Sequence, residues 1–177
     1  MKATFICAIG SIVLLSCSQP PKIDEAAAKR VEAIALYQKN LSVLKLGLQA
    51  FQDEQMDVWA DGVSDSVIWN SAAYGSSPGK KEDWKKSLSG YVSEWDSIRL
   101  KNPIFLPGVD TAKFEPDGSV RYYGQWAAIH KSGVRTSVNF YGSYQFNNDN
   151  KIVQATDFFD IGGMMNSLMP KVMPKTK

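Results

Sequence analysis

The sequence predicts an α+β domain in which one curved, mostly antiparallel sheet packs against helices. Three C-terminal segments, 119–131, 134–146 and 151–159, alternate polar and apolar residues with the period of two that is typical of strands. Short turns join these segments, so neighbouring strands should be antiparallel. Two earlier segments, 24–55 and 77–98, repeat apolar residues in steps of three and four, which is typical of amphipathic helices.

The start of the chain resembles a bacterial lipoprotein signal. Lys2 precedes an apolar run, Phe5 to Leu15, that is too short to span a bilayer as a helix. The run ends Leu14-Leu15-Ser16-Cys17, which resembles the motif cut before a cysteine that already carries a diacylglyceryl group. An ordinary secretory signal with a chance cysteine is the alternative. We therefore expect residues 1–16 to be removed and Cys17 to be lipidated and acylated.

A lipid on Cys17 would hold the mature protein in the bacterial cell envelope, outside the cytoplasm, with the inner or outer membrane as its partner. Residues 17–23 would form the tether, residues 24–169 one domain and residues 170–177 a basic tail. The other cysteine, Cys7, would be discarded, which excludes disulfides and thiol chemistry from the domain. The nearly balanced charge, formally +2 for the whole chain, gives no reason to expect a nucleic-acid partner.

The N-terminal half of the predicted domain is mainly helical. The first helix has Asp24 as its expected N-cap and leaves open a break near Asn40. A short helix at 56–61, ended by Gly62, precedes a first strand at 65–69. The next helix is expected to start at Ser77-Pro78, an N-cap followed by proline at the first helical position. The apolar stripes of the two long helices are Ile34, Tyr37, Leu41, Leu44, Leu48 and Phe51, and Trp84, Leu88, Tyr91, Trp95 and Ile98.

The C-terminal half is mainly strand. Pro103 and Pro107 cannot donate ladder hydrogen bonds, so the segment 99–108 is predicted as an edge strand. Gly124 and Gly142 allow bends that would curl the long strands around the helices. Asp160 is the expected cap of a closing helix, 161–169, which Pro170 ends.

This order of elements resembles the nuclear transport factor two-like superfamily, particularly its SnoaL-like members. The resemblance covers about residues 40–168 and implies a cone-shaped, mixed, mostly antiparallel sheet wrapped around N-terminal helices, a cystatin-like roll. It also implies a pocket between the two layers and, often, homodimers formed through the outer sheet face. The motifs that carry it are Asp61…Asp65-Ser66-Val67-Ile68-Trp69, Gly124-Gln125-Trp126…His130…Gly133, and Asn150-Lys151-Ile152-Val153…Asp157-Phe158-Phe159-Asp160.

Asp157 and His130 are the candidate catalytic residues. In SnoaL-like cyclases an aspartate at the matching point of the last strand is the acid/base catalyst, and an apolar cone would raise its pKa. A local hydrogen bond or a solvent-facing position is the alternative for Asp157. His130, the only histidine, matches a pocket-facing histidine of many SnoaL-like strands, and a structural role is its alternative. We expect no metal and no cofactor, because carboxylates do not cluster with His130 and no phosphate-binding motif is present.

Seven aromatic residues are predicted to surround an apolar ligand, with plain core packing as the alternative for each. Steroid-isomerase chemistry is disfavoured, since Asn70 stands where those relatives carry a carboxylate base and 41–55 lacks their tyrosine. The seven predicted ligand-binding residues are Trp59, Trp69, Tyr91, Trp95, Tyr122, Trp126 and Tyr144.

Three functions follow for this scaffold, which carries many activities. The first is a membrane-anchored lipoprotein that binds a small apolar or aromatic molecule without catalysis. The second is a SnoaL-like cyclase, isomerase or hydratase that uses Asp157 as acid/base. The third is a protein-interaction module whose outer sheet face exposes apolar side chains around Tyr123, Ile129 and Tyr141.

Overall fold

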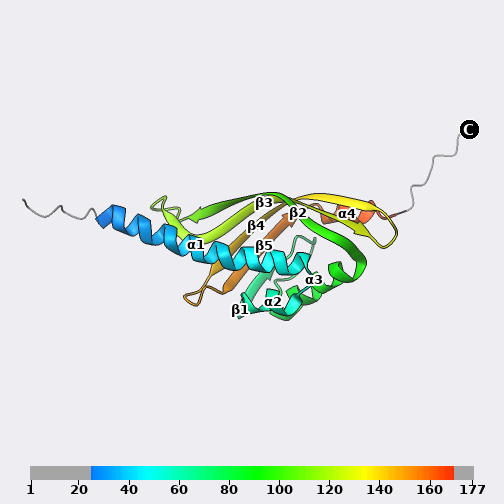
Figure 1. Cartoon of the computed structure of the whole chain (residues 1–177), viewed down its shortest axis with the longest axis horizontal. Helices are drawn as coiled ribbons and strands as arrows, with labels where there is room; N and C mark the ends of the chain where they lie inside the picture. The colour runs from blue at the N-terminus through cyan, green and yellow to red at the C-terminus, as the bar shows by residue number, and fades with distance from the viewer. Residues whose placement is uncertain (1–24, 170–177) are drawn as a thin grey trace, which may run out of the picture.

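The structure is a computed structural model that describes residues 25–169. The predicted signal peptide, Cys17, Asp24 and the tail from residue 170 lie outside the described residues. The described part of the chain forms, in order, α1 (Glu25–Gln52), α2 (Met56–Asp61), β1 (Val63–Asn70), α3 (Lys81–Glu94), β2 (Trp95–Val109), β3 (Pro116–His130), β4 (Arg135–Phe146), β5 (Ile152–Phe159) and α4 (Ile161–Asn166) (Figure 1).

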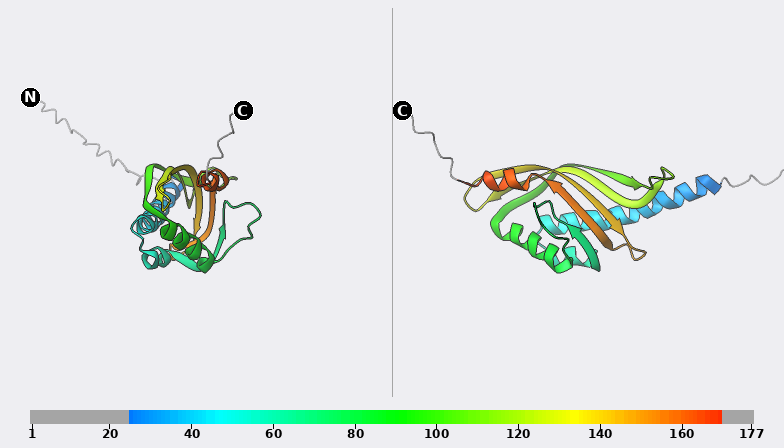
Figure 2. Two further views of the ribbon diagram at one scale, coloured as in Figure 1. Left: turned by 90° about the vertical axis from the view of Figure 1, so that its right-hand side faces the viewer. Right: turned by 180° about the vertical axis from the view of Figure 1, so that it is seen from behind.

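The five strands form one mixed sheet in the order β1-β5-β4-β3-β2. β1 pairs with β5 in parallel, and the other three pairings are antiparallel. The sheet curls around α1, α2 and α3 (Figure 2). The predicted α+β fold with a curved sheet around N-terminal helices is therefore confirmed, and β2 occupies an edge as its prolines indicated.

Irregular pairing along β2 accompanies the curvature of the sheet. Its register against β3 shifts between Asp96 and Arg99, between Lys101 and Ile104, and again after Pro107. Ser97 (φ 55°) and Asn102 (φ 50°) adopt left-handed backbone conformations inside the first two shifts. Bulges of this kind bend a strand and increase its twist. The sequence prediction had assigned the bending to glycines alone.

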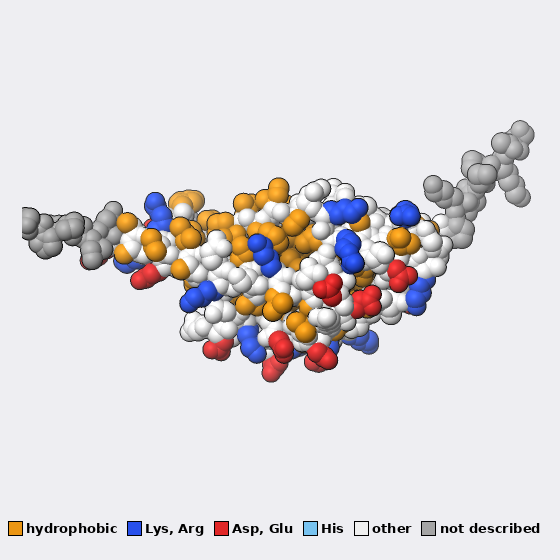
Figure 3. All heavy atoms as spheres, in the orientation of Figure 1, with side chains coloured by type: hydrophobic (Ala, Val, Ile, Leu, Met, Phe, Trp, Pro, Cys, Tyr) orange, Lys and Arg blue, Asp and Glu red, His pale blue; other side chains and the backbone are white. Residues whose placement is uncertain are grey.

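Helix α1 is continuous through Asn40, so the break considered there is absent. Asn40 is buried, and its amide nitrogen donates to the carbonyl oxygen of Gly118 at 2.7 Å. Its amide oxygen accepts from Nδ2 of Asn150 at 2.8 Å. These two bonds tie the middle of the helix to the start of β3 and to the β4–β5 turn. The first turns of α1 extend past the sheet (Figure 1), and hydrophobic side chains lie on the surface at that end (Figure 3). Ile34, expected to be buried, is 46 % exposed.

Helix α3 begins at Lys81, three residues later than expected, because the preceding segment is bound to β1. The backbone N–H and C=O of Gly79 bond to Trp69 at 2.8 and 2.9 Å. Asp83 then accepts from the backbone N–H of Lys80 at 2.8 Å. The helix ends at Glu94, since Trp95 already pairs with β3, so Ile98 lies in β2 and not in the helix.

Trp84 connects α3 to the rest of the core. It is 4 % exposed and stacks on Trp69 and Tyr144, with ring centroids 6.0 and 6.3 Å apart. The ring of Trp59 meets it edge-on at 4.9 Å. The predicted aromatic inner face of α3 therefore packs across the concave sheet.

Between residues 25 and 169, the helices are too short or too polar to cross a membrane.

Candidate ligand-binding cavity

A cavity of about 250 Å³ lies between the concave face of the sheet, helices α1 and α3, and the loop at residues 71–73. Its walls are mainly aromatic and aliphatic side chains. All seven aromatic residues predicted from the sequence border it, and their role in binding stays a prediction. They are Trp59, Trp69, Tyr91, Trp95, Tyr122, Trp126 and Tyr144.

Strand alternation explains how distant segments supply this wall. Side chains two residues apart on a strand point to the same face. Tyr144 therefore shares its face of β4 with Phe140, and Asp157 shares its face of β5 with Phe159. Phe140, Phe159 and Phe51 border the cavity although the sequence prediction did not assign them to it. The period-two alternation of β4 and β5 already predicted that Phe140 and Phe159 share a face with Tyr144 and Asp157.

Asp157 is the only charged side chain among the described residues around the cavity. It is 8 % exposed. Its Oδ2 accepts from the indole Nε1 of Trp69 at 2.8 Å, and its Oδ1 accepts from the hydroxyl of Tyr144 at 3.1 Å. Burial raises the pKa of Asp157 to about 6, although these two donors pull it down. The carboxylate is thus partly neutralised by protons near pH 6, with two uncharged donors as its partners.

Gly142 makes the Tyr144 contact possible. Gly142 is the residue opposite Asp157 in the β4–β5 pairing. A Cβ atom at position 142 would lie 2.5 Å from the Tyr144 hydroxyl oxygen and 2.6 Å from Cε2 of its ring. Only glycine leaves the space in which the Tyr144 ring reaches across to the carboxylate.

Three tyrosines around Asp157 stay protonated at neutral pH. Burial, with the negative charge of Asp157, raises the pKa of Tyr91 to about 12. The same two causes raise the pKa of Tyr122 and of Tyr144 far above the ordinary value. The hydroxyl oxygen of Tyr122 accepts from Nε1 of Trp126 at 3.0 Å. These phenols therefore act as neutral hydrogen-bonding groups, and not as bases.

Trp95, which borders the cavity, has an unsatisfied donor. Its side chain is buried, and its indole N–H has no hydrogen-bond partner among the described residues. It is the one buried side-chain donor or acceptor of residues 25–169 in this condition. A buried donor left unpaired is costly, so such groups in native proteins require an explanation.

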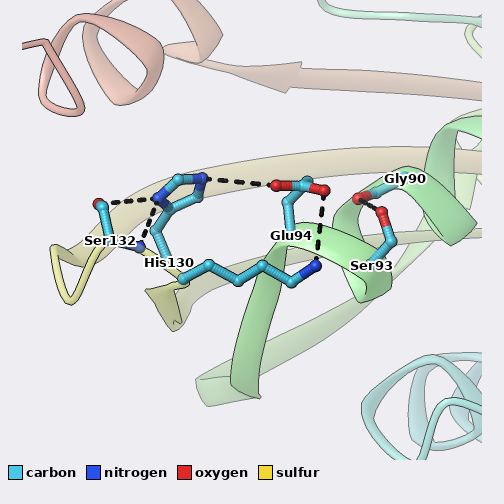
Figure 4. A network of polar contacts seen from close by, with 6 residues as sticks. Gly90, Ser93, Glu94, His130 and Ser132 are labelled. Atoms are coloured by element: carbon cyan, nitrogen blue, oxygen red, sulfur yellow. Dashed lines mark hydrogen bonds and ion pairs between the residues drawn. The ribbon is translucent and has the colours of Figure 1, made fainter.

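His130 is not among the residues that line the cavity, contrary to the expected pocket-facing position. Its Nδ1 lies 2.8 Å from the hydroxyl oxygen of Ser132, and its Nε2 lies 3.9 Å from a carboxylate oxygen of Glu94 (Figure 4). The ring packs on Trp95, with centroids 4.9 Å apart. The predicted alternation of side chains along β3 is correct, but the strand continues past the cavity. Its last residue, His130, therefore packs against the end of α3.

Two polar residues at and after the end of β1 lie outside the cavity lining. Tyr74 is fully exposed in the loop after β1 (106 %). Asn70 donates from Nδ2 to the Thr156 hydroxyl at 3.2 Å. Among residues 25–169 no group of three or more His, Cys, Asp or Glu side chains is placed to hold a metal ion.

Solved structures of other proteins share this architecture. A nuclear transport factor two-like protein of unknown function from Burkholderia pseudomallei is 15 % identical, with a TM-score of 0.60 over 75 % of this chain and 98 % of its own. A proposed polyketide cyclase from Xanthomonas campestris is 8 % identical, with a TM-score of 0.61 over 75 % of this chain and 98 % of its own. The chain has the nuclear transport factor two-like fold. An LEH-like epoxide hydrolase from M. tuberculosis is 17 % identical, with a TM-score of 0.53 over 74 % of this chain and 90 % of its own.

The nuclear transport factor two-like fold is what these likenesses establish, because the identities are far below those that transfer an activity. No protein-family model and no curated relative matches the sequence. The function therefore has to be argued from the cavity itself.

Proposed function

We propose that the protein is a lipid-anchored lipoprotein of the bacterial cell envelope whose domain binds one small, largely apolar or aromatic molecule. The observation that carries the binding part of the proposal is the cavity of about 250 Å³ with aromatic walls and one buried carboxylate. Convergence of a few polar groups in an apolar pocket is the usual form of a small-molecule site. Since an engineered cavity of about 150 Å³ holds benzene, this one suits a molecule of one or two rings.

Binding is tested by thermal unfolding of the purified protein against a panel of one- and two-ring compounds. A compound present at about 100 times its Kd should raise the Tm by roughly 5–10 °C. The variant Ala128→Phe, which places a large ring in the cavity, should lose the response while keeping its circular dichroism spectrum. Absence of any shift across the panel in the native protein would contradict the proposal.

Catalysis by Asp157 is the second candidate, favoured by its burial at the cavity and its pKa of about 6. If the carboxylate acts as a general base, only its ionised form works, so turnover of a bound compound should rise with pH through about 6 and then level off. Asp157→Asn should lower kcat by about 10²- to 10⁴-fold. A rate unchanged in this variant would exclude the role.

Membrane anchoring through Cys17 is tested in cells. The chain with Cys17 intact should sediment with the membrane fraction and carry acyl chains detectable by mass spectrometry. Cys17→Ser should remain uncut and unlipidated. Recovery of a Cys17→Ser protein cut before residue 17 would indicate an ordinary secretory signal instead.

The outer sheet face supports the third function, a protein-interaction surface. Tyr141 stacks on Tyr123 at 4.8 Å and on Phe158 at 5.5 Å, so one aromatic row crosses β3, β4 and β5. Tyr123 is 47 % exposed and Phe158 53 %. A homodimer formed through this row stays a prediction of the family resemblance.

A further inference from the structure

Among residues 25–169, the negative charge of the cavity has no positive counterpart. Within this part of the chain, Asp157 receives hydrogen bonds only from the indole of Trp69 and the hydroxyl of Tyr144, both uncharged. The other titratable side chains around the cavity are Tyr91, Tyr122 and Tyr144. Lysine, arginine and histidine are absent from the described residues that line it. A buried charge is normally paired with a charge of opposite sign. The residues that line the cavity supply no such partner for Asp157.

The aromatic walls are compatible with a cation. The indole of Trp69 donates to Asp157 and stacks on Trp84, which stacks in turn on Tyr144, so these rings cover part of one another's faces. Tyr91 and Trp95 also border the cavity, with centroids 5.4 Å apart. The faces of aromatic rings carry partial negative charge and attract ammonium groups, with Trp the strongest. A ring face open to the cavity would therefore act in the same direction as the carboxylate.

We infer that the ligand is a small organic cation: an ammonium group, placed against Asp157, on an aromatic or apolar body of one or two rings. This inference rests on the proposed binding function and narrows its ligand class. It excludes anions, which Asp157 repels, and it ranks neutral molecules below amines of the same shape.

Three probes of similar size and different charge test the inference by isothermal titration calorimetry at pH 7.5. They are phenethylamine, 2-phenylethanol and phenylacetate. The amine should bind roughly 10- to 100-fold more tightly than the alcohol, as expected for a hydrogen bond to a charged group. Phenylacetate should give no heat of binding.

Two variants locate the effect. Asp157→Asn keeps an acceptor for Trp69 and removes the charge, so it should abolish the preference for the amine over the alcohol. Asp96→Asn, at an exposed position of β2, removes the same charge elsewhere and should preserve the preference. The preference should therefore disappear only in the first variant.

The outcomes separate the two proposals. If the alcohol binds as tightly as the amine, or if Asp157→Asn retains the preference, the cation inference is wrong and the proposed binding function stands. If none of the three probes binds and the wider thermal-shift panel also gives no response, both proposals fail.

Discussion

Replacing Asp157 with asparagine is expected to stabilise the ligand-free protein by about 3 kcal/mol at pH 7.5. The pKa of Asp157 is about 6 in the folded protein against an ordinary value of 3.8. The folded state therefore holds this proton more tightly than the unfolded state does. Stability from this group is fully present below pH 3.8 and is lost as the pH rises to about 6. Asparagine cannot ionise, so the variant avoids this loss.

The measurement is the free energy of unfolding by urea for both proteins between pH 3.5 and 8. The difference should be small near pH 4, grow through pH 6 and stay constant above it, where it corresponds to a Tm increase of roughly 6–12 °C. Taking the difference removes the contribution of the other carboxyl groups. A variant less stable than the native protein at pH 7.5 would show that the ionised carboxylate is a structural requirement. If the native carboxylate instead lowers the stability, as expected, its presence despite that cost is typical of a functional site.

Replacing Trp84 with alanine is expected to destabilise the protein by about 3–5 kcal/mol, the usual cost of removing a large buried ring. Trp84 is 4 % exposed and contacts the rings of Trp59, Trp69 and Tyr144. The change removes the contact that joins α3 to α2, β1 and β4. Calorimetry should record a Tm lowered by roughly 6–20 °C.

Two controls accompany this measurement. Trp84→Phe keeps one ring of the contact and should lose less than half as much stability. Phe114→Ala, at a position 81 % exposed, should change the free energy of unfolding by less than about 0.5 kcal/mol. A Trp84→Ala variant as stable as the native protein would mean that α3 does not pack across the sheet.

The strands and their faces were predictable because period-two alternation is a local property of the chain. Val120, Tyr122 and Trp126 share a face in the sequence pattern, and the structure places Val120 and Tyr122 in the core and Tyr122 and Trp126 at the cavity. The helical stripe likewise predicted that Trp84 and Tyr91 face inward. These local patterns account for most of the aromatic residues around the cavity.

Features set by pairing between distant segments were not predictable. The start of α3 depends on the bridge between Trp69 and Gly79, and the end of α3 on the pairing of Trp95 with His130. The position of His130 outside the cavity has the same origin. The partners of Asp157 lie 88 residues away, at Trp69, and 13 residues away, at Tyr144. No local pattern specifies that these three side chains meet.

A carbon-13 NMR titration of the Asp157 carboxyl carbon tests most directly whether a buried carboxylate faces an apolar cavity. The signal is assigned by its loss in Asp157→Asn and followed from pH 3 to 8, without ligand and with saturating phenethylamine. The structure predicts a pKa of about 6 in the free protein, and a lower pKa once the amine is bound, because a cation favours the ionised form. A pKa near 3.8 in the free protein would contradict the buried site, and a pKa unmoved by the bound amine would contradict the contact with Asp157.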